Sequence, residues 1–196
     1  TQRALIDDSV TDQVAAVPGV AAAEGSIVSY QLTVLDKKGD AIGGAGPPTV
    51  VGSWDTDPIL ASYQVADGRA PTKAGEAIID RAGAEKADYE IGDTIVVISP
   101  KGRNELKIVG ISMFGKADSA GGSFFVGTTL PEAQRLAGEP GKLNQVNARA
   151  DEGVSPEQLV KAIQDANVLK GADVVTGRQA ADEQASDIKQ GFGFFT

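Results

Sequence analysis

The chain has 196 residues, of which 41% are hydrophobic and 23% charged, and it carries a formal net charge of −9. This length suits one domain or two small lobes with a buried core. The negative charge argues against nucleic acid or anionic lipid as a partner, because both require clustered Lys and Arg side chains. The chain has no Cys and no His. Disulfides, thiolate nucleophiles and imidazole bases or ligands are therefore excluded.

The first quarter of the chain is predicted to hold one helix followed by strands. Residues 7–17 read as a helix, because acidic residues open it and apolar residues recur at i, i+4 and i+7 before Pro18-Gly19 ends it. The pattern then predicts a strand, a turn, a Gly/Pro-rich loop and a second strand, at residues 20–35, 36–40, 43–48 and 49–54.

The middle of the chain, residues 55–130, changes to short strands with few helical signals. One or two helical turns are predicted at residues 82–87. A hairpin is predicted from two strands around the turn at residues 100–104. The strands expected in this region are residues 77–79, 94–99, 106–113 and 123–127.

Helical signals return in the last third. A helix is predicted from Leu130-Pro131-Glu132 to a terminator at Gly138. Ser155-Pro156-Glu157-Gln158 predicts a second helix with a capping box, and Thr176 with Gln179 suggests another capping box on a helix from 177 to about 189. Strands are expected at residues 143–150 and 173–175.

Residues 7–28 and 155–176 share one order, a capped helix, a short break and a Val-rich strand. Two such units on one sheet predict an α+β fold in which both chain ends form one lobe. The strand-rich middle is then an inserted β-rich lobe. The expected boundaries are 1–54 and 131–190 for the first lobe and 55–130 for the insert. Coincidence is the alternative explanation of the similarity.

Groups suited to chemistry are scarce. Asp55 and Asp57 have the spacing of an oxygen-ligand metal loop, but a third ligand is missing and Asp57 before Pro58 is typical of a turn. The same applies to residues 36–40. Ser112 lies in a Gly-rich stretch one residue too long for a nucleophile elbow, and no His or Ser-x-x-Lys pair could activate it. We therefore predict no catalytic, cofactor-binding or metal-binding residue, and no cofactor.

The end of the chain, residues 191–196, contains three Phe residues after a polar predicted helix. Aromatic side chains are enriched at the interfacial level of membranes. We interpret these residues as the start of a transmembrane helix in the parent protein. The alternative is a loop that packs its aromatic side chains on the domain.

Several short motifs follow one another in a fixed order and at regular spacing. They are Asp8-Ser9-Val10 through Val17-Pro18-Gly19-Val20, Gly46-Pro47-Pro48 leading to Ser53-Trp54, Gly68-Arg69-Ala70-Pro71, Gly75-Glu76 with Ile79-Asp80, Gly92-Asp93-Thr94, Val109-Gly110-Ile111, Val154-Ser155-Pro156-Glu157 and Gly191-Phe192-Gly193-Phe194-Phe195. Together they resemble the extracytoplasmic domain of MacB/FtsX-type ABC transporter permeases, over nearly the whole chain.

The resemblance implies a non-catalytic domain on the outer face of the bacterial plasma membrane, between the permease's first and second transmembrane helices. It implies a porter-like lobe from both chain ends and an inserted β-rich lobe. The implied partners are a second permease subunit, a cytoplasmic ATP-binding subunit and an extracellular protein, peptide or lipid substrate. The implied roles are export, lipid or lipoprotein handling, or regulation of a partner outside the membrane.

Gly75, Gly92 and Asp93 match the family pattern as turn residues, which is a structural role. A free-standing extracellular binding or adhesion module with a similar fold is the alternative function. A hydrolase is a weaker third possibility. The discriminating feature is the parent gene, which should encode hydrophobic spans on both sides of this chain if the permease interpretation is correct.

Overall fold

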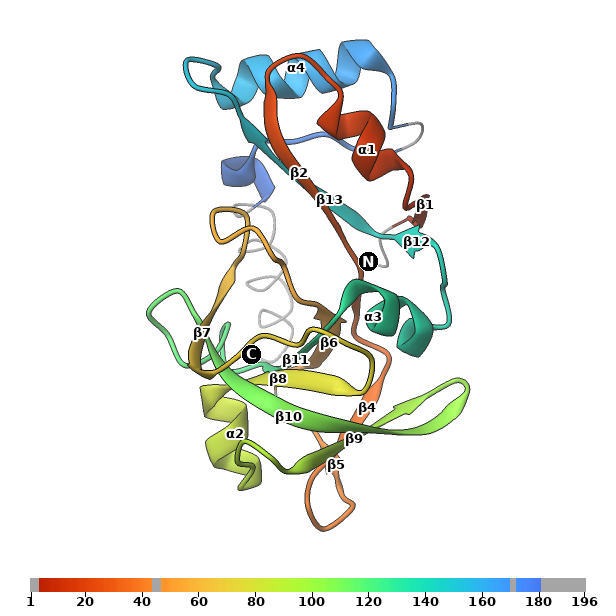
Figure 1. The fold of residues 1–196 in the computed structure, drawn as a ribbon, viewed down its shortest axis with the longest axis vertical. Helices are drawn as coiled ribbons and strands as arrows, with labels where there is room; N and C mark the ends of the chain where they lie inside the picture. Colours follow the sequence, from red (N-terminus) through yellow and green to blue (C-terminus); the bar gives the residue numbers. More distant parts are fainter. Residues whose placement is uncertain (1–3, 44–46, 170–171, 181–196) are drawn as a thin grey trace, which may run out of the picture. The chain divides into compact units, whose positions relative to one another are not determined.

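One mixed sheet organises most of the chain in the computed structural model, which describes residues 4–43, 47–169 and 172–180 (Figure 1). Within these residues the sheet has nine strands in the order β3-β6-β11-β8-β10-β9-β4-β5, and β7 pairs with β10. The strands are β3 (Val28–Ser29), β4 (Thr33–Leu35), β5 (Ala41–Ile42), β6 (Thr49–Ser53), β7 (Tyr63–Gly68), β8 (Glu76–Asp80), β9 (Thr94–Ser99), β10 (Gly102–Phe114) and β11 (Phe124–Thr128).

Strand β10 is the longest element of the sheet and pairs with three others. Its first half forms a hairpin with β9 at the predicted place, but the turn is tighter than the expected 100–104, because Gly102 already lies opposite Ser99. Its second half is parallel to β8 on one side and antiparallel to β7 along Gly110–Phe114. The parallel pairs β10–β8 and β11–β6 make the sheet mixed. The 13 residues of β10 therefore hold the centre of the sheet together.

The hydrophobic core lies against one face of this sheet. Strand β8 is buried at every position, as expected for a continuous apolar run flanked by strands on both sides. The helices α2 (Arg81–Ala87) and α3 (Leu130–Ala137) contribute to the same core. Core residues that are at most 2% exposed are Val34, Val51, Ala77, Ile79, Ile95, Val97, Leu106, Ile108, Val126 and Leu136.

Packing divides the chain into two compact units, Thr1–Asp8 with Glu24–Asn147 and Ser9–Ala23 with Ala148–Thr196. The first unit contains the nine-stranded sheet and a short pair of β1 (Ile6–Asp7) with β12 (Lys142–Leu143). A further two-stranded sheet pairs β2 (Val20–Ser26) with β13 (Gln145–Ala150). Each of these two strands begins in one unit and ends in the other.

The second unit is built around two helices, α1 (Val10–Ala15) and α4 (Pro156–Ala166). The predicted capping box of α4 is confirmed, since Ser155 Oγ accepts a hydrogen bond from Gln158 N at 3.2 Å and Ser155 N donates to Gln158 Oε1 at 2.8 Å. Such a cap satisfies backbone groups that the first helical turn leaves unpaired. Leu159 and Ile163 form the buried face of the helix.

The predicted α+β class is confirmed, and most predicted elements are present. Two differ. Residues 173–175 were expected as a strand but have no regular structure, and the described residues offer them no partner strand. The predicted strand at 20–35 is divided into β2, β3 and β4. The lobe boundaries expected at 54/55 and 130/131 stay a prediction.

The C-terminal predictions lie mostly beyond the described part of the chain. Residues 177–180 are helical, as predicted. The rest of that helix, and the proposed start of a transmembrane helix at 191–196, lie outside the described residues. None of the helices within the described residues is long and apolar enough to cross a membrane.

Candidate functional site

The Asp55–Asp57 segment folds as a turn around a carboxylate from β2. Glu24 accepts hydrogen bonds from Thr56 N at 2.6 Å, from Thr56 Oγ1 at 2.7 Å and from Asp57 N at 3.1 Å. Asp57 Oδ1 accepts from Ile59 N at 2.8 Å, which is an Asx turn. Burial raises the pKa of Asp55 to about 6, and the charge of Glu24 adds to the rise. Of the two interpretations of this motif, a metal loop and a turn, the structure therefore shows the turn.

The second acidic motif is also a turn. Asp36 Oδ1 accepts hydrogen bonds from the backbone N–H groups of Lys38 and Asp40 at 2.8 and 2.9 Å. Its carboxylate is thus engaged by the turn itself. The described part of the chain contains no group of three or more Asp or Glu side chains placed to hold a metal ion.

Ser112, the only serine considered as a nucleophile, lies within β10 and is completely buried. A nucleophile elbow instead presents its serine on a sharp turn between a strand and a helix, open to substrate. The position of Ser112 does not have this geometry. Ser112 lies in register with Asp80, the last residue of β8.

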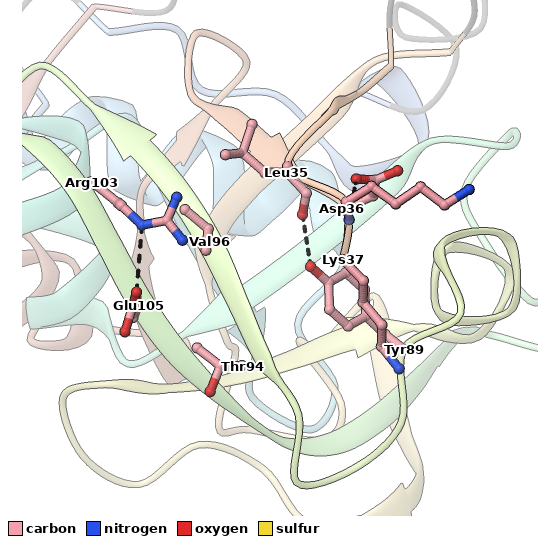
Figure 2. Close-up of a pocket in the computed structure, with 10 residues that line it drawn as sticks. Leu35, Asp36, Lys37, Tyr89, Thr94, Val96, Arg103 and Glu105 are labelled. Carbon is pink, nitrogen blue, oxygen red and sulfur yellow. Dashed lines mark hydrogen bonds and ion pairs between the residues drawn. The ribbon is translucent and has the colours of Figure 1, made fainter.

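A shallow depression of about 430 Å³ lies beside the turn after β4 (Figure 2). The hydroxyl of Tyr89 donates to the carbonyl oxygen of Leu35 at 2.8 Å on one side. Arg103 and Glu105 pair at 3.4 Å on the other side, and both are more than half exposed. Lys37 lies 5.8 Å above the Tyr89 ring. The lining groups are paired with one another, which is a common arrangement for a solvated protein surface.

A second depression, of about 550 Å³, has a more defined polar wall. Arg69 donates from both terminal nitrogens to the two carboxylate oxygens of Glu76, with Nη1 to Oε2 at 2.8 Å. Thr72 N also donates to Glu76, at 3.0 Å. These donors lower the pKa of Glu76 to about 2, the Arg69 side chain first. Lys73 and Lys107 complete the rim.

Gly110 on β10 makes room for this ion pair. A Cβ atom at Gly110 would lie 2.3 Å from the carbonyl oxygen of Arg69 and 3.1 Å from its nitrogen. Arg69 N donates to the carbonyl oxygen of Val109 at 3.0 Å. The backbone at Arg69 therefore touches β10 closely, and only glycine permits the approach.

Gly75, Gly92 and Asp93 have the structural role in turns that the family resemblance implies. Gly92 has a φ of +102°, which glycine adopts without strain. Asp93 accepts a hydrogen bond from Glu90 N at 2.9 Å and pairs with Lys37 at 2.8 Å, and the Lys37 partner lowers the pKa of Asp93. Gly75 O accepts from Lys107 N at 2.8 Å and so joins the turn before β8 to β10.

Two features of this region were not predicted from the sequence. The first is the pairing of Arg69 with Glu76, although both residues stand in motifs that were noted, Gly68-Arg69 and Gly75-Glu76. The second is the burial of Asp80 at the end of β8, with no exposed surface. The sequence did offer one signal for the burial of Asp80, because this acidic residue directly follows a continuous apolar run.

Solved structures with a similar fold come from transporter proteins. The periplasmic region of MacB from Actinobacillus actinomycetemcomitans matches with a TM-score of 0.63 at 10% identity, over 100% of this chain and 86% of that one. The extracellular domain of the noncanonic ABC-type transporter YknZ from Gram-positive bacteria matches with a TM-score of 0.57 at 14% identity, over 86% and 87%. A domain of a putative permease protein from Porphyromonas gingivalis matches with a TM-score of 0.55 at 16% identity, over 83% and 70%.

At these identities the solved structures establish the fold. Among curated protein sequences no match was found. The model of one family, the MacB-like periplasmic core domain, matches residues 1–166 of the chain. This match covers the whole first compact unit, the second unit as far as residue 166, and every motif noted above except the C-terminal one. The chain therefore belongs to the MacB-like periplasmic core domain family, whose members lie on the extracytoplasmic side of the membrane.

Proposed function

We propose that the chain is the extracytoplasmic domain of an ABC transporter permease, between the first and second transmembrane helices of its parent. The observation that carries this proposal is the family match over residues 1–166. The fold supports it, because the similar structures are described as transporter and permease domains. Residues 191–196 would then lead into the second transmembrane helix.

In this role the domain is non-catalytic and passes ATP-driven motion to a partner outside the membrane. The chain crosses from one compact unit to the other three times. Two of these crossings lie within strands that pair with each other, at 23/24 in β2 and at 147/148 in β13. A displacement of one unit can therefore reach the other through these strands and change the distance between the units.

The partners in this proposal are a second permease subunit and a cytoplasmic ATP-binding subunit, both engaged through other parts of the parent. Outside the membrane, the domain would act on a protein, peptide or lipid. The resulting process is export, handling of a lipid or lipoprotein, or regulation of the partner.

The placement is tested first on the parent gene. Hydropathy in a 19-residue window, computed over about 60 codons on each side, should show an apolar span before Thr1 and another after Thr196. Polar sequence or a stop codon at both junctions would contradict the proposal. It would favour the alternative, a free-standing extracellular binding or adhesion module.

The coupling role is tested by distances in the full-length permease. This chain has no Cys, so once any Cys elsewhere in the parent is replaced, spin labels can be attached at Gln64→Cys on β7 and Glu157→Cys on α4, both exposed and in different units. We expect the distance distribution of this pair to change between ATP-bound and ATP-free states. A control pair inside the first unit, Gln64→Cys with Lys101→Cys, should not change. Identical distributions for both pairs in both states would overturn the coupling role.

A further inference from the structure

Asp80 ends β8 and has no exposed surface. Its Oδ1 accepts a hydrogen bond from the backbone N–H of Phe125 at 2.8 Å. Its Oδ2 has no hydrogen-bond partner among the residues that the structure describes. A buried oxygen of an ionised carboxyl that lacks a donor has lost its hydration without compensation.

A second buried oxygen in the same situation lies next to it. Ser112 is the direct partner of Asp80 in the parallel register of β8 and β10. Partners in register extend from the same face of a sheet. Ser112 is also 0% exposed, and within the described residues its Oγ has no partner. The two side chains are not hydrogen-bonded to each other, although a serine hydroxyl could donate to an ionised carboxylate. A neutral carboxyl does not require a donor at its O–H oxygen and can donate that O–H to a hydroxyl.

The elements packed around Asp80 bring no free cation to it within the described part of the chain. On α2, Arg81 pairs with Asp118 of the following loop at 3.3 Å. From β7, Tyr63 stacks its ring on Phe125 of β11 with centroids 4.0 Å apart. Strand β10 contributes the neutral Ser112, β11 the backbone N–H of Phe125, and α2, whose N-cap residue is Asp80, the backbone N–H of Gly83. Burial raises the pKa of Asp80 to about 6, and the N–H groups of Phe125 and Gly83 limit the rise.

We propose that Asp80 is a proton-binding site inside the domain, neutral in the folded protein under mildly acidic conditions and ionised at neutral pH only at the expense of folding stability. Ser112 and the N–H of Phe125 are the groups that suit the neutral carboxyl. The inference concerns the fold of the first unit and does not depend on the transport role. A domain outside the membrane is exposed to the pH of its surroundings, so this site would make its stability respond to acid.

The sign of the effect follows from linkage. The carboxyl has a pKa of 3.8 in its unperturbed form and about 6 in the folded state. Between these values the folded state binds more protons than the unfolded state, so stability falls as pH rises through this window. The contribution is constant below pH 4 and above the folded value. A difference of about two units corresponds to roughly a 100-fold change in the folding equilibrium constant.

The test compares the chain with its Asp80→Asn variant by urea denaturation from pH 4 to pH 8. The amide keeps an oxygen for the N–H of Phe125 and carries no charge. We expect the ratio of the folding constants, variant to wild type, to rise roughly 100-fold across this range. The control is Asp40→Asn, the same change at an exposed turn residue, which reports the effect of the substitution itself.

A constant ratio for Asp80→Asn would overturn the proposal. If the variant does not fold, carbon-13 NMR of the Asp80 carboxyl in the wild-type chain gives the answer directly. A titration midpoint near 6 supports the proton-binding site. A midpoint at or below 4 refutes it, including the case in which a bound water or cation keeps the carboxylate ionised.

Discussion

Strand β8 has a carboxyl group at each end, and the structure treats the two in opposite ways. Glu76 opens the strand with 4% exposure and Asp80 ends it with 0%. Arg69 and Thr72 donate to Glu76 and lower its pKa to about 2. Burial raises the pKa of Asp80 to about 6, and only backbone N–H groups, those of Phe125 and Gly83 among them, limit the rise. Similar exposure thus accompanies opposite pKa shifts.

The comparison teaches that the available donors, and not depth alone, decide the charge state of a buried carboxyl. Glu76 lies at the rim of a depression, where the Arg69 side chain stays 51% exposed and keeps part of its hydration. A guanidinium at the other end of β8 would have to be buried entirely. Desolvation of two charges there would offset most of their attraction.

The strongest way to break the contrast is Gly110→Ala. The added Cβ would meet the backbone of Arg69 at 2.3 Å, so β7 and Arg69 would have to move away from β10. We expect the free energy of unfolding to fall by about 3 kcal/mol, as for other overpacked sites. Urea denaturation measures it. Gly177→Ala is the control, since among the described residues a Cβ there meets nothing within 4 Å. Equal stability of both variants would show that the backbone at Arg69 is not fixed as described.

The next largest effect is expected from Arg69→Met, which removes the charged partner of Glu76. Glu76 would keep Thr72 N and the longer contact with Lys73 at 3.9 Å, and loss of its bidentate partner should lower the melting temperature by several degrees. The double variant with Glu76→Gln should recover part of this loss, because the orphaned charge is gone. Arg103→Met is the control, since its pair with Glu105 is more than half exposed on both sides and should contribute little. Equal losses for Arg69→Met and Arg103→Met would contradict a special role for the Glu76 end.

The two ends of β8 together predict an unusual pH profile. Because the folded pKa of Glu76 is lowered, its stabilisation is present above 4.5 and is lost as pH falls toward 2. Because that of Asp80 is raised, its contribution is lost as pH rises from 3.8 to 6. We expect the melting temperature of the wild-type chain to be highest near pH 4–5, measured by circular dichroism from pH 3 to 8. A steady rise up to pH 7 would mean that Asp80 does not hold a proton.

The elements with local signals could be predicted from the sequence. Ser155 and Gln158 are three residues apart and cap α4 without help from the rest of the fold. The hairpin of β9 and β10 has the apolar strand β9 before a Pro- and Gly-containing turn and a β10 that becomes apolar after Lys107. Strand β8 was expected from its continuous apolar run. In each case the information lies within a few residues.

What could not be predicted depends on contacts between distant segments. Strand β7 was missed because five of its six residues are exposed, which leaves no alternation to recognise. Residues 173–175 have strand-forming side chains but no partner in the described chain, so propensity failed there. Asp80 and Ser112 meet only through the parallel register of β8 with β10. The chemistry of both ends of β8 is therefore set by tertiary pairing.

The smallest expected effect sharpens the comparison at a third carboxyl, Asp55. Its pKa is raised to about 6, first by burial and then by the charge of Glu24. Asp55→Asn should stabilise the chain above pH 6 by at most about 1 kcal/mol, since the group keeps some solvent contact. The same urea titration between pH 4 and 8 measures it.

Glu24→Gln separates the two causes at Asp55. The amide oxygen can still accept from one of the N–H groups of Thr56 and Asp57, which bind different oxygens of Glu24, and the neighbouring charge is gone. Because burial is the larger cause, the pKa of Asp55 should fall only in part, and most of the pH dependence should remain. Its complete loss would mean that charge repulsion alone controls Asp55. Asp80 would then be the only carboxyl among those discussed to support the claim that burial without a charged donor raises a pKa.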